Sequence, residues 1–363
     1  MRVICAGGGT GGHINPAIAI AKHIAQKNPG SEFLFVGTKN GMEKTLVPKA
    51  GFPITFIDVY GFKRSLSLSN LKTVCKAFTS LLKCRKIIKD FKPDVVVGTG
   101  GYVSGPVLAA ASFMKIPTVI LEQNVFAGMT SKMLSKLVDT VCLGFEETRK
   151  SFPDAKKVVL TGTPIRDELF LTDKESARKG LGIDSKPFVV CFGGSLGAET
   201  INNAMTDFIN KQAKDNYNVL FATGENSYKY TVKNITNTKE NIKVVPYIYN
   251  MDQVMNAADL LICRSGAITT CEIAALGKPS VLIPSPNVTD NHQHYNAKAL
   301  SDKDASVLIT EQQLKENPEI LNNTITSLLK DKEKLQKMSE NALKIGIKDG
   351  CERIYNEIKT VVK

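Results

Sequence analysis

The feature of this 363-residue sequence that most constrains its fold is a regular alternation of short apolar runs with helical patterns. The short runs are rich in β-branched residues and predict strands, and the stretches between them have the spacing of helices. Such alternation forms βαβ units with parallel strands, so we predict an α/β protein. The predicted strands are 3–6, 33–36, 54–59, 95–98, 118–121 and 140–143 in the first half, and 188–192, 219–222, 242–245, 260–263, 280–283 and 307–309 in the second.

The two halves of the chain begin alike. VICAGGGTGG at 3–12 and VVCFGGSLGA at 189–198 both predict a strand, a glycine-rich turn and the start of a helix. The chain also exceeds the length at which one hydrophobic core usually stops growing. We predict two Rossmann-like domains whose parallel sheets face a central crevice at their carboxyl ends. The expected domains are 1–164, joined by a C-terminal helix at about 346–363, and 165–345.

Composition narrows the class of protein. With 43% hydrophobic and 23% charged residues the chain matches a soluble globular protein. It has no uninterrupted apolar stretch of the roughly 18 residues that a bilayer span needs. The first residues run directly into a predicted strand, so we expect no signal peptide and a cytoplasmic protein. The eight cysteines include no Cys-x-x-Cys pair, so neither a disulfide framework nor a zinc site is expected.

The net charge of +12 is concentrated in the first half. Residues 1–165 hold 22 Lys and Arg against 10 Asp and Glu, whereas 166–363 hold 25 of each kind, and 59–89 contains eight basic residues and no acid. This asymmetry indicates an anionic partner, either nucleic acid or acidic lipid. Because Phe78 is the only aromatic ring between Leu66 and Asp90, the basic run lacks the stacking platforms typical of nucleic-acid binding. We therefore expect no nucleic-acid partner.

The first glycine loop matches the dinucleotide-binding pattern Gly-x-Gly-x-x-Gly at Gly7, Gly9 and Gly12. A dehydrogenase also needs an acid at the end of the second strand to hold the adenosine ribose. This chain has Gly-Thr-Lys at 37–39, and Glu32 lies at the wrong end of that strand, which disfavours NAD and FAD. The loop amides remain suited to a phosphate or a developing negative charge. A turn that serves only close packing is the alternative.

His13 closes this loop, where a helix is predicted to begin, and is one of only four histidines. Its imidazole titrates near neutral pH, which makes it a candidate general base. A histidine that caps the turn or binds a substrate oxygen is the alternative.

Further polar clusters follow other predicted strands. The glycines and hydroxyl at 193–195 suit a diphosphate, and Glu272 can accept two hydrogen bonds from a ribose diol, unless it is held in a salt bridge. Because the carboxyl ends of parallel strands share one edge of a sheet, clusters in one domain should converge. The clusters are 100–106 and 122–124 in the first half, and 193–195, 264–267 with Glu272, and 290–293 in the second.

In this order, the motifs at 10–13, 100–106, 122–124, 193–198, 264–267 with Glu272, and 290–293 resemble the motif set of the MurG family, which are glycosyltransferases of the GT-B fold at the membrane surface. The resemblance covers residues 3 to about 345. It implies inverting transfer of N-acetylglucosamine from UDP-N-acetylglucosamine to the 4-hydroxyl of lipid I, which forms lipid II for peptidoglycan at the cytoplasmic face of the bacterial membrane. It also implies other cell-wall synthesis proteins as partners.

The resemblance assigns roles to individual residues. For catalysis it implies His13 and Asn124. For the donor it implies Thr10, Gly11, Gly12, Asn124, Arg166, Ser195, Ile248, Arg264, Ala267, Glu272, His292 and Gln293. For the acceptor it implies Gly11, Gly12, His13, Tyr102, Ser104 and Glu122. Leu196 and the pair His294-Tyr295 depart from the family pattern and leave local donor contacts open.

No cofactor is expected. The only Asp-x-Asp triplet, at 302–304, follows a predicted helix and not a strand, so we interpret it as a solvated loop and expect no metal site. Helix N-termini and Arg264 would then stabilise the departing UDP. The alternatives are a UDP-N-acetylglucosamine 2-epimerase and another GT-B lipid glycosyltransferase.

A helix predicted over 69–90 is a candidate for docking on anionic phospholipid of the inner leaflet. Its apolar residues recur at three- and four-residue steps, with lysines beside them. Packing of this face on the sheet is the alternative. The residues expected at the membrane are Leu71, Lys72, Val74, Lys76, Phe78, Leu81 and Leu82.

Overall fold

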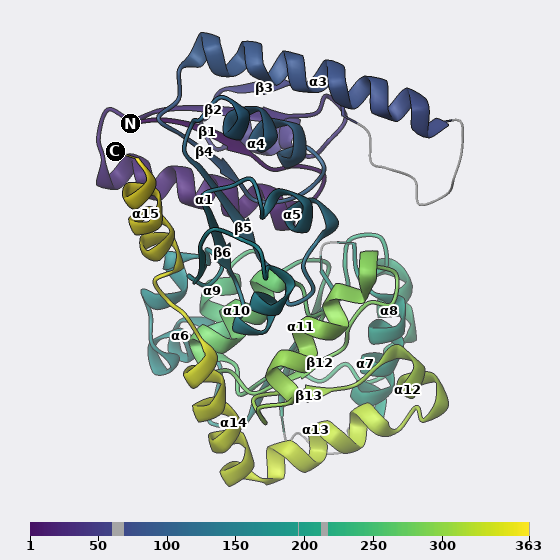
Figure 1. The fold of residues 1–363 in the computed structure, drawn as a ribbon. Coiled ribbons are helices and arrows are strands. Elements are labelled where there is room, and N and C mark those ends of the chain that lie inside the picture. The colour runs from purple at the N-terminus through teal and green to yellow at the C-terminus, as the bar shows by residue number, and fades with distance from the viewer. Residues whose placement is uncertain (60–68, 195, 212–216, 363) are drawn as a thin grey trace. The chain divides into compact units, whose positions relative to one another are not determined.

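The computed structural model describes residues 1–59, 69–194, 196–211 and 217–362, with the backbone alone at 69–78. The chain divides into two compact units, Met1–Ile165 with Ile347–Lys363, and Arg166–Gly346. Each boundary lies one residue beyond the predicted one. Both units contain a parallel sheet with helices on it (Figure 1), so the predicted α/β class is confirmed.

The first unit is built on a seven-stranded parallel sheet in the order β3-β2-β1-β4-β5-β6-β7. Two differences from the sequence prediction concern its edges. β3 ends at Phe56, earlier than predicted, and the short strand β7 was not predicted. The strands are β1 (Arg2–Ala6), β2 (Glu32–Gly37), β3 (Ile54–Phe56), β4 (Val95–Gly98), β5 (Thr118–Glu122), β6 (Thr140–Leu143) and β7 (Val158–Leu160).

Helices cover both faces of this sheet, which explains its almost wholly apolar strands. Val3 and Cys5 of β1 belong to one buried cluster with residues of α1 and α15, while Ile4 and Ala6 belong to a second with residues of α3 and α4. α15 packs beside α1, as predicted for the C-terminal helix. The helices are α1 (Gly11–Lys27), α2 (Glu43–Lys49), α3 (Ser69–Phe91), α4 (Ser104–Phe113), α5 (Met129–Leu134), the 3-10 turn η1 (Glu146–Ser151) and α15 (Gly350–Val361).

The second unit repeats this plan with a six-stranded parallel sheet in the order β10-β9-β8-β11-β12-β13. Its strands are β8 (Phe188–Phe192), β9 (Asn218–Ala222), β10 (Ile242–Val245), β11 (Leu260–Cys263), β12 (Ser280–Leu282) and β13 (Val307–Leu308). Its helices are η2 (Asp167–Phe170), α6 (Lys174–Leu181), α7 (Glu199–Lys211), α8 (Tyr228–Asn234), α9 (Met251–Ala257), α10 (Ala267–Leu276), η3 (Thr289–Asn291), α11 (His292–Ser301), α12 (Glu311–Glu316), α13 (Ile320–Lys330) and α14 (Lys332–Ile345).

The strand order places one switch point in each sheet. β1 lies between β2 and β4, and β8 lies between β9 and β11. In each sheet the chain first adds strands on one side of the central strand and then continues on its other side. Ligands of open α/β sheets bind at the carboxyl ends of strands at such a point. The glycine loops that follow β1, β4 and β8 therefore lie where binding is expected within each unit.

The structure also bears on membrane-spanning helices and on the cysteines. Within the described ranges, no helix combines the length and apolarity needed to cross a membrane. Six of the seven described cysteines are buried, and none of the seven is in a disulfide. Burial raises the pKa of Cys5 to about 12. These thiols therefore act as small core side chains.

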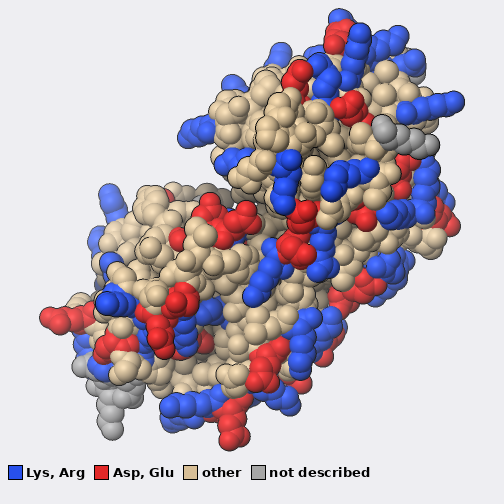
Figure 2. Space-filling model, turned by 90° about the vertical axis from the view of Figure 1, so that its left-hand side faces the viewer, with Lys and Arg blue, Asp and Glu red and all other residues tan. Residues whose placement is uncertain are grey.

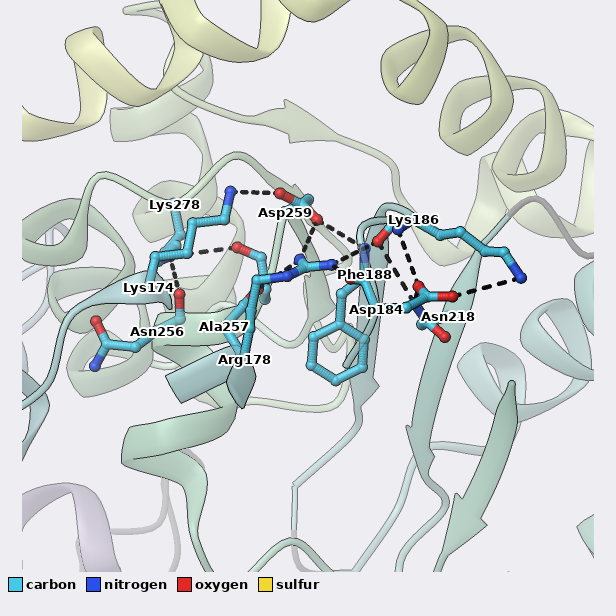
Figure 3. Close-up of polar contacts among 11 residues, drawn as sticks. Lys174, Arg178, Asp184, Lys186, Phe188, Asn218, Asn256, Ala257, Asp259 and Lys278 are labelled. Carbon is cyan, nitrogen blue, oxygen red and sulfur yellow. Dashed lines mark hydrogen bonds and ion pairs between the residues drawn. The ribbon is translucent and has the colours of Figure 1, made fainter. Parts of the chain in front are cut away.

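A polar cluster fixes α6 and α9 to the start of β8 in the second unit (Figure 3). Asp259 accepts hydrogen bonds from Arg178 at 2.8 Å and from the Phe188 amide at 2.7 Å, and it also pairs with Lys174. Lys278 lies nearby and donates to the carbonyl oxygens of Asn256 at 2.6 Å and Ala258 at 3.3 Å. These carbonyls lie at the C-terminus of α9, where a cation is favoured.

Lys278 predicts a pH-dependent stability. Burial lowers its pKa from 10.5 to about 8. Because the folded state then binds fewer protons than the unfolded state between these values, the lysine's contribution to the unfolding free energy rises with pH across this window. The free energy of unfolding of wild type minus that of Lys278→Met should rise by about 2 kcal/mol from pH 7 to 9.5 in urea titrations. If the difference in unfolding free energy between the two proteins does not change with pH, the lowered pKa of Lys278 is wrong.

Candidate functional site

In the first unit, two glycine turns at the carboxyl edge of the sheet pack against each other. They follow β1 and β4, and a side chain at Gly101 would bring its Cβ to 2.4 Å from the carbonyl oxygen of Gly8. Gly101 also has a φ of 75°, which favours glycine. Glycine is required here because only bare backbone allows the turns to meet. The two glycine turns predicted at this edge of the first sheet therefore lie together.

His13 lies on the first turn of α1 and is bonded to the second of these turns. Its Nδ1 is 3.0 Å from the carbonyl oxygen of Thr99, and the Thr99 hydroxyl donates to the His13 carbonyl at 2.7 Å. A carbonyl only accepts, so Nδ1 carries the proton and the neutral ring has its lone pair on Nε2. A Cβ at Gly100 would lie 2.6 Å from Nδ1, so that glycine makes room for the ring. This tautomer suits a general base.

Glu43, which the sequence reasoning missed, holds the first glycine loop. Its Oε2 accepts from the Gly9 amide at 3.0 Å, and its Oε1 accepts from the amide and hydroxyl of Thr38, each at 2.8 Å. The carboxylate is fully buried, yet these hydrogen bonds outweigh the burial and lower its pKa. The Gly9 amide therefore binds a carboxylate of the protein, contrary to the expectation that the loop amides are free for phosphate.

Ser104 and Tyr102 differ in their access to a ligand. Ser104 is fully buried, and its hydroxyl lies 2.7 Å from the Ala6 carbonyl oxygen and 2.8 Å from that of Gly100. It therefore ties the two turns together and does not face an acceptor, which corrects the sequence prediction. Tyr102 is 40% exposed and remains accessible. Thr10 and Gly12 are exposed and Gly11 is half-buried at the start of α1.

Glu122 is the last residue of β5 and is buried. Its carboxylate accepts from the amides of Asn124 at 3.1 Å and Gly128 at 3.0 Å. It therefore orders the loop that carries Asn124, whereas the sequence predicted direct contact with the acceptor. Asn124 is half-buried, and its carbonyl accepts from the Thr148 hydroxyl at 3.0 Å.

In the second unit, the loop after β8 packs against the loop after β9. Gly194 and Gly197 have φ values of 93° and 79°, and a Cβ at Gly197 would lie 2.2 Å from the carbonyl oxygen of Thr223. Leu196, one of the departures from the family pattern, is 77% exposed. Ser195, predicted to contact the diphosphate, lies outside the described residues.

Glu272 on α10 forms a two-pronged ion pair with Arg166. The Arg166 Nε and Nη2 donate to the two carboxylate oxygens at 2.8 and 3.0 Å. Burial raises the pKa of Glu272, and Arg166 opposes that effect. The salt-bridged alternative for Glu272 is thus the arrangement observed. Arg166 is accessible, because 46% of its side chain is exposed against 4% for Glu272.

Arg264, predicted to lie near phosphates, is held mainly by the protein. Its guanidinium pairs with Glu311 and donates to the Ile283 carbonyl at 3.1 Å. Only 16% of its side chain is exposed, so it fixes the end of β11 to α12. Ala267 is the first residue of α10, directly after this loop.

The segment at the start of α11 is fixed through Gln293. Its Oε1 accepts from the Ser285 amide at 2.9 Å, and its carbonyl accepts from the Ser265 hydroxyl at 2.8 Å. His292 is half-buried, with Nδ1 2.8 Å from the Thr289 carbonyl oxygen. Ile248 is buried at the loop after β10. The structure thus brings Gln293 against the loop that begins α10.

Across the described ranges, no group of three or more His, Cys, Asp or Glu side chains is placed to hold a metal ion. Asp302 directly follows α11 and pairs with Lys298 at 2.6 Å, and Asp304 has a φ of 51° in the turn that follows. The triplet at 302–304 thus lies in a turn after a helix, as interpreted from the sequence.

Two of the residues expected at the membrane have described side chains. Leu82 is 51% exposed, whereas Leu81 is half-buried and packs against the core cluster beneath α3 and α4. Leu81 therefore packs against the core of the first unit, as the alternative to membrane docking predicted. The other five lie outside the described side chains: Leu71, Lys72, Val74, Lys76 and Phe78.

Comparison with known proteins agrees with this architecture. The glycosyltransferase family 28 N-terminal domain matches residues 3–143, and the family 28 C-terminal domain matches 188–354. A solved structure of MurG from Acinetobacter baumannii is 30% identical, with a TM-score of 0.83 and 99% of each chain covered. A UDP-GlcNAc 2-epimerase from Neisseria meningitidis is 16% identical with a TM-score of 0.68 over 99% of this chain and 100% of that one, which shows only a shared fold.

Curated relatives agree over the full length. A protein of Acetivibrio thermocellus is 52% identical, covering 100% of this chain and 99% of its own. One of Listeria welshimeri is 42% identical over 100% of both. Each is named UDP-N-acetylglucosamine–N-acetylmuramyl-(pentapeptide) pyrophosphoryl-undecaprenol N-acetylglucosamine transferase. The chain therefore belongs to the MurG family of glycosyltransferases.

Proposed function

We propose that this enzyme transfers N-acetylglucosamine from UDP-N-acetylglucosamine to the N-acetylmuramoyl unit of lipid I, which yields lipid II. The observation that carries the proposal is the 52% identity, over the whole chain, to a transferase named for these substrates. The acceptor is lipid-linked, so the enzyme works at the cytoplasmic face of the membrane as a peripheral protein.

The chemistry is a single inverting displacement. The acceptor 4-hydroxyl attacks the anomeric carbon of the α-linked sugar, the bond to the diphosphate breaks, and UDP leaves with the negative charge. His13 is placed to take the hydroxyl proton on Nε2 while Nδ1 donates to Thr99. The exposed guanidinium of Arg166 and the amides at the start of α10 are suited to stabilise the diphosphate. We propose that no metal is required.

One assay tests this proposal. Purified enzyme is incubated with radiolabelled UDP-N-acetylglucosamine and a short-chain lipid I analogue, with and without EDTA. Label should appear in the disaccharide lipid in both samples. Loss of product with EDTA would overturn metal independence, and free N-acetylmannosamine in place of the lipid product would identify an epimerase.

We also propose that the surface formed by α3 and α4, two helices in contact, docks on anionic phospholipid. Leu82 on α3 and Phe113 at the end of α4 are 51% and 64% exposed. Lys83, Lys86 and Lys115 are exposed on the same two helices or directly after them. Apolar side chains flanked by lysines are typical of an interfacial surface.

Replacing Lys83 and Lys86 with glutamine should weaken binding to vesicles that contain phosphatidylglycerol by roughly 30-fold, measured by sedimentation, since each basic residue near such a surface contributes about 1 kcal/mol. Figure 2 shows that basic side chains are spread widely over the face drawn, with acids among them, so charge loss alone needs a control. Lys332→Gln with Lys337→Gln on the exposed side of α14 provides it. Equal loss in both double variants, or none in the first, would contradict docking by α3.

A further inference from the structure

The buried carboxylate of Glu43 lies in a slot made by glycines from three segments. A Cβ at Gly41 would lie 2.1 Å from Oε2, one at Gly37 would lie 2.5 Å from the Glu43 Cγ, and one at Gly8 would lie 2.7 Å from Oε1. These glycines belong to the β1 loop, the end of β2 and the segment before α2. The slot therefore surrounds an ionised side chain that bonds to none of the residues proposed to touch substrate.

The two oxygens of this carboxylate have separate partners. Oε1 binds Thr38, whose amide and hydroxyl belong to the segment after β2. Oε2 binds the Gly9 amide, four residues before His13. Gly9 has a φ of 89°, and the next residue, Thr10, is the N-cap of α1, whose carbonyl accepts from the His13 amide at 3.1 Å. The position of the Gly9 amide thus fixes the start of the helix that carries His13.

In nucleotide-binding folds of this kind, the amides of the first glycine loop bind a phosphate. Here the carboxylate of Glu43 takes that place at Gly9, and the acid needed for a cofactor ribose is absent at the end of β2. A loop whose anion site is filled by the protein has a fixed conformation before substrate arrives. Preorganised geometry of this kind is what positions a general base.

We propose that Glu43 is a positioning residue for the transfer reaction, which acts through the Gly9 amide to hold the first turn of α1 and with it His13. The proposal rests on the proposed function. In this proposal Glu43 affects turnover although it contacts neither substrate. A purely structural Glu43 would instead alter stability, with turnover following only the loss of folded protein.

The test compares the two oxygens of one carboxylate. Glu43→Gln keeps only one acceptor oxygen, and Thr38 offers it two hydrogen bonds against one from Gly9. We expect the oxygen to face Thr38 and the amide nitrogen to face the Gly9 N–H, so the bond to Gly9 is lost. Thr38→Val removes the 2.8 Å hydrogen bond from the Thr38 hydroxyl to Oε1 and leaves the 3.0 Å bond from Gly9 to Oε2, which makes it the matched control. We expect Glu43→Gln to lower kcat by about 10-fold to 100-fold with the donor KM within about twofold. Thr38→Val should keep kcat although both variants lower Tm.

Hydrogen–deuterium exchange gives a readout that does not depend on activity. Peptides covering 7–15 should lose protection in Glu43→Gln and not in Thr38→Val. Wild-type enzyme that makes no disaccharide lipid would refute the proposed function, and the exchange data would still decide whether Glu43 orders the loop. Should Glu43→Gln fail to fold, Gly41→Ala displaces the same carboxylate and should give the same losses. Unchanged kcat in the folded variant, or equal kcat losses in Glu43→Gln and Thr38→Val, would overturn the proposal.

Discussion

Replacing His13 with alanine is expected to lower kcat by roughly 10² to 10⁴, the contribution typical of a positioned general base, with little change in donor KM. The imidazole lies at the carboxyl edge of the first sheet, and the bond from Nδ1 to the Thr99 carbonyl leaves the lone pair on Nε2. In the proposed mechanism, its removal deprives the attacking hydroxyl of its proton acceptor. Steady-state kinetics with a soluble lipid I analogue measure both constants.

Two further variants separate base chemistry from structure. His13→Asn keeps a nitrogen that can donate to Thr99 but has no titratable group, so kcat should fall as in the alanine variant. His23, on the same helix, bonds to Glu352 of α15 at 3.0 Å and serves as the control. His23→Ala should lower Tm with kcat unchanged. An asparagine variant with near-wild-type turnover would exclude His13 as the base.

The sequence predicted the central strands well and the edges poorly. The inner strands are continuous apolar runs because helices cover both faces, and that pattern is visible without a structure. β7, by contrast, has three residues at an edge and is too short to show a pattern. β3 ends at Phe56 although the predicted strand continued to Val59. Ile57 is still buried and its amide donates to the Gly37 carbonyl at 2.9 Å, so its apolar character reports burial and not the length of the strand.

The sequence predicted the glycine turns of the first unit but not the partners of its acids and hydroxyls. Glycine loops after strands can be recognised in the sequence, because close backbone contacts and positive φ values in these turns require glycine. Whether a polar side chain faces a ligand or the protein depends on contacts between distant segments. Ser104, Glu122 and Glu43 each bond to backbone within the first unit. For Glu43, the glycines at 37 and 41 shortly before it were a usable signal, because residues without a side chain leave room for the acid to fold inward.

Arg166 and Glu272 are expected to respond unequally to substitution. Arg166→Ala leaves a buried carboxylate without its partner, which should lower the unfolding free energy by about 2 to 3 kcal/mol, toward the lower end for a buried pair because the guanidinium is half in water. Glu272→Gln leaves an arginine that water still solvates, so its loss should be smaller. Urea titrations of both single variants and the double variant measure the pair's coupling.

The same pair should control donor affinity. The ribose role that the family resemblance implies for Glu272 requires its carboxylate to exchange Arg166 for the diol, which frees the guanidinium for the diphosphate. Glu272→Gln should then raise donor KM by about 10-fold to 100-fold, the loss expected for hydrogen bonds to a charged group, with kcat changed far less. Glu311→Gln, which breaks the neighbouring ion pair to Arg264, is the control and should leave donor KM nearly unchanged. A Glu272→Gln enzyme that is destabilised but keeps its donor KM would reduce this ion pair to a structural link between α10 and the start of the second unit.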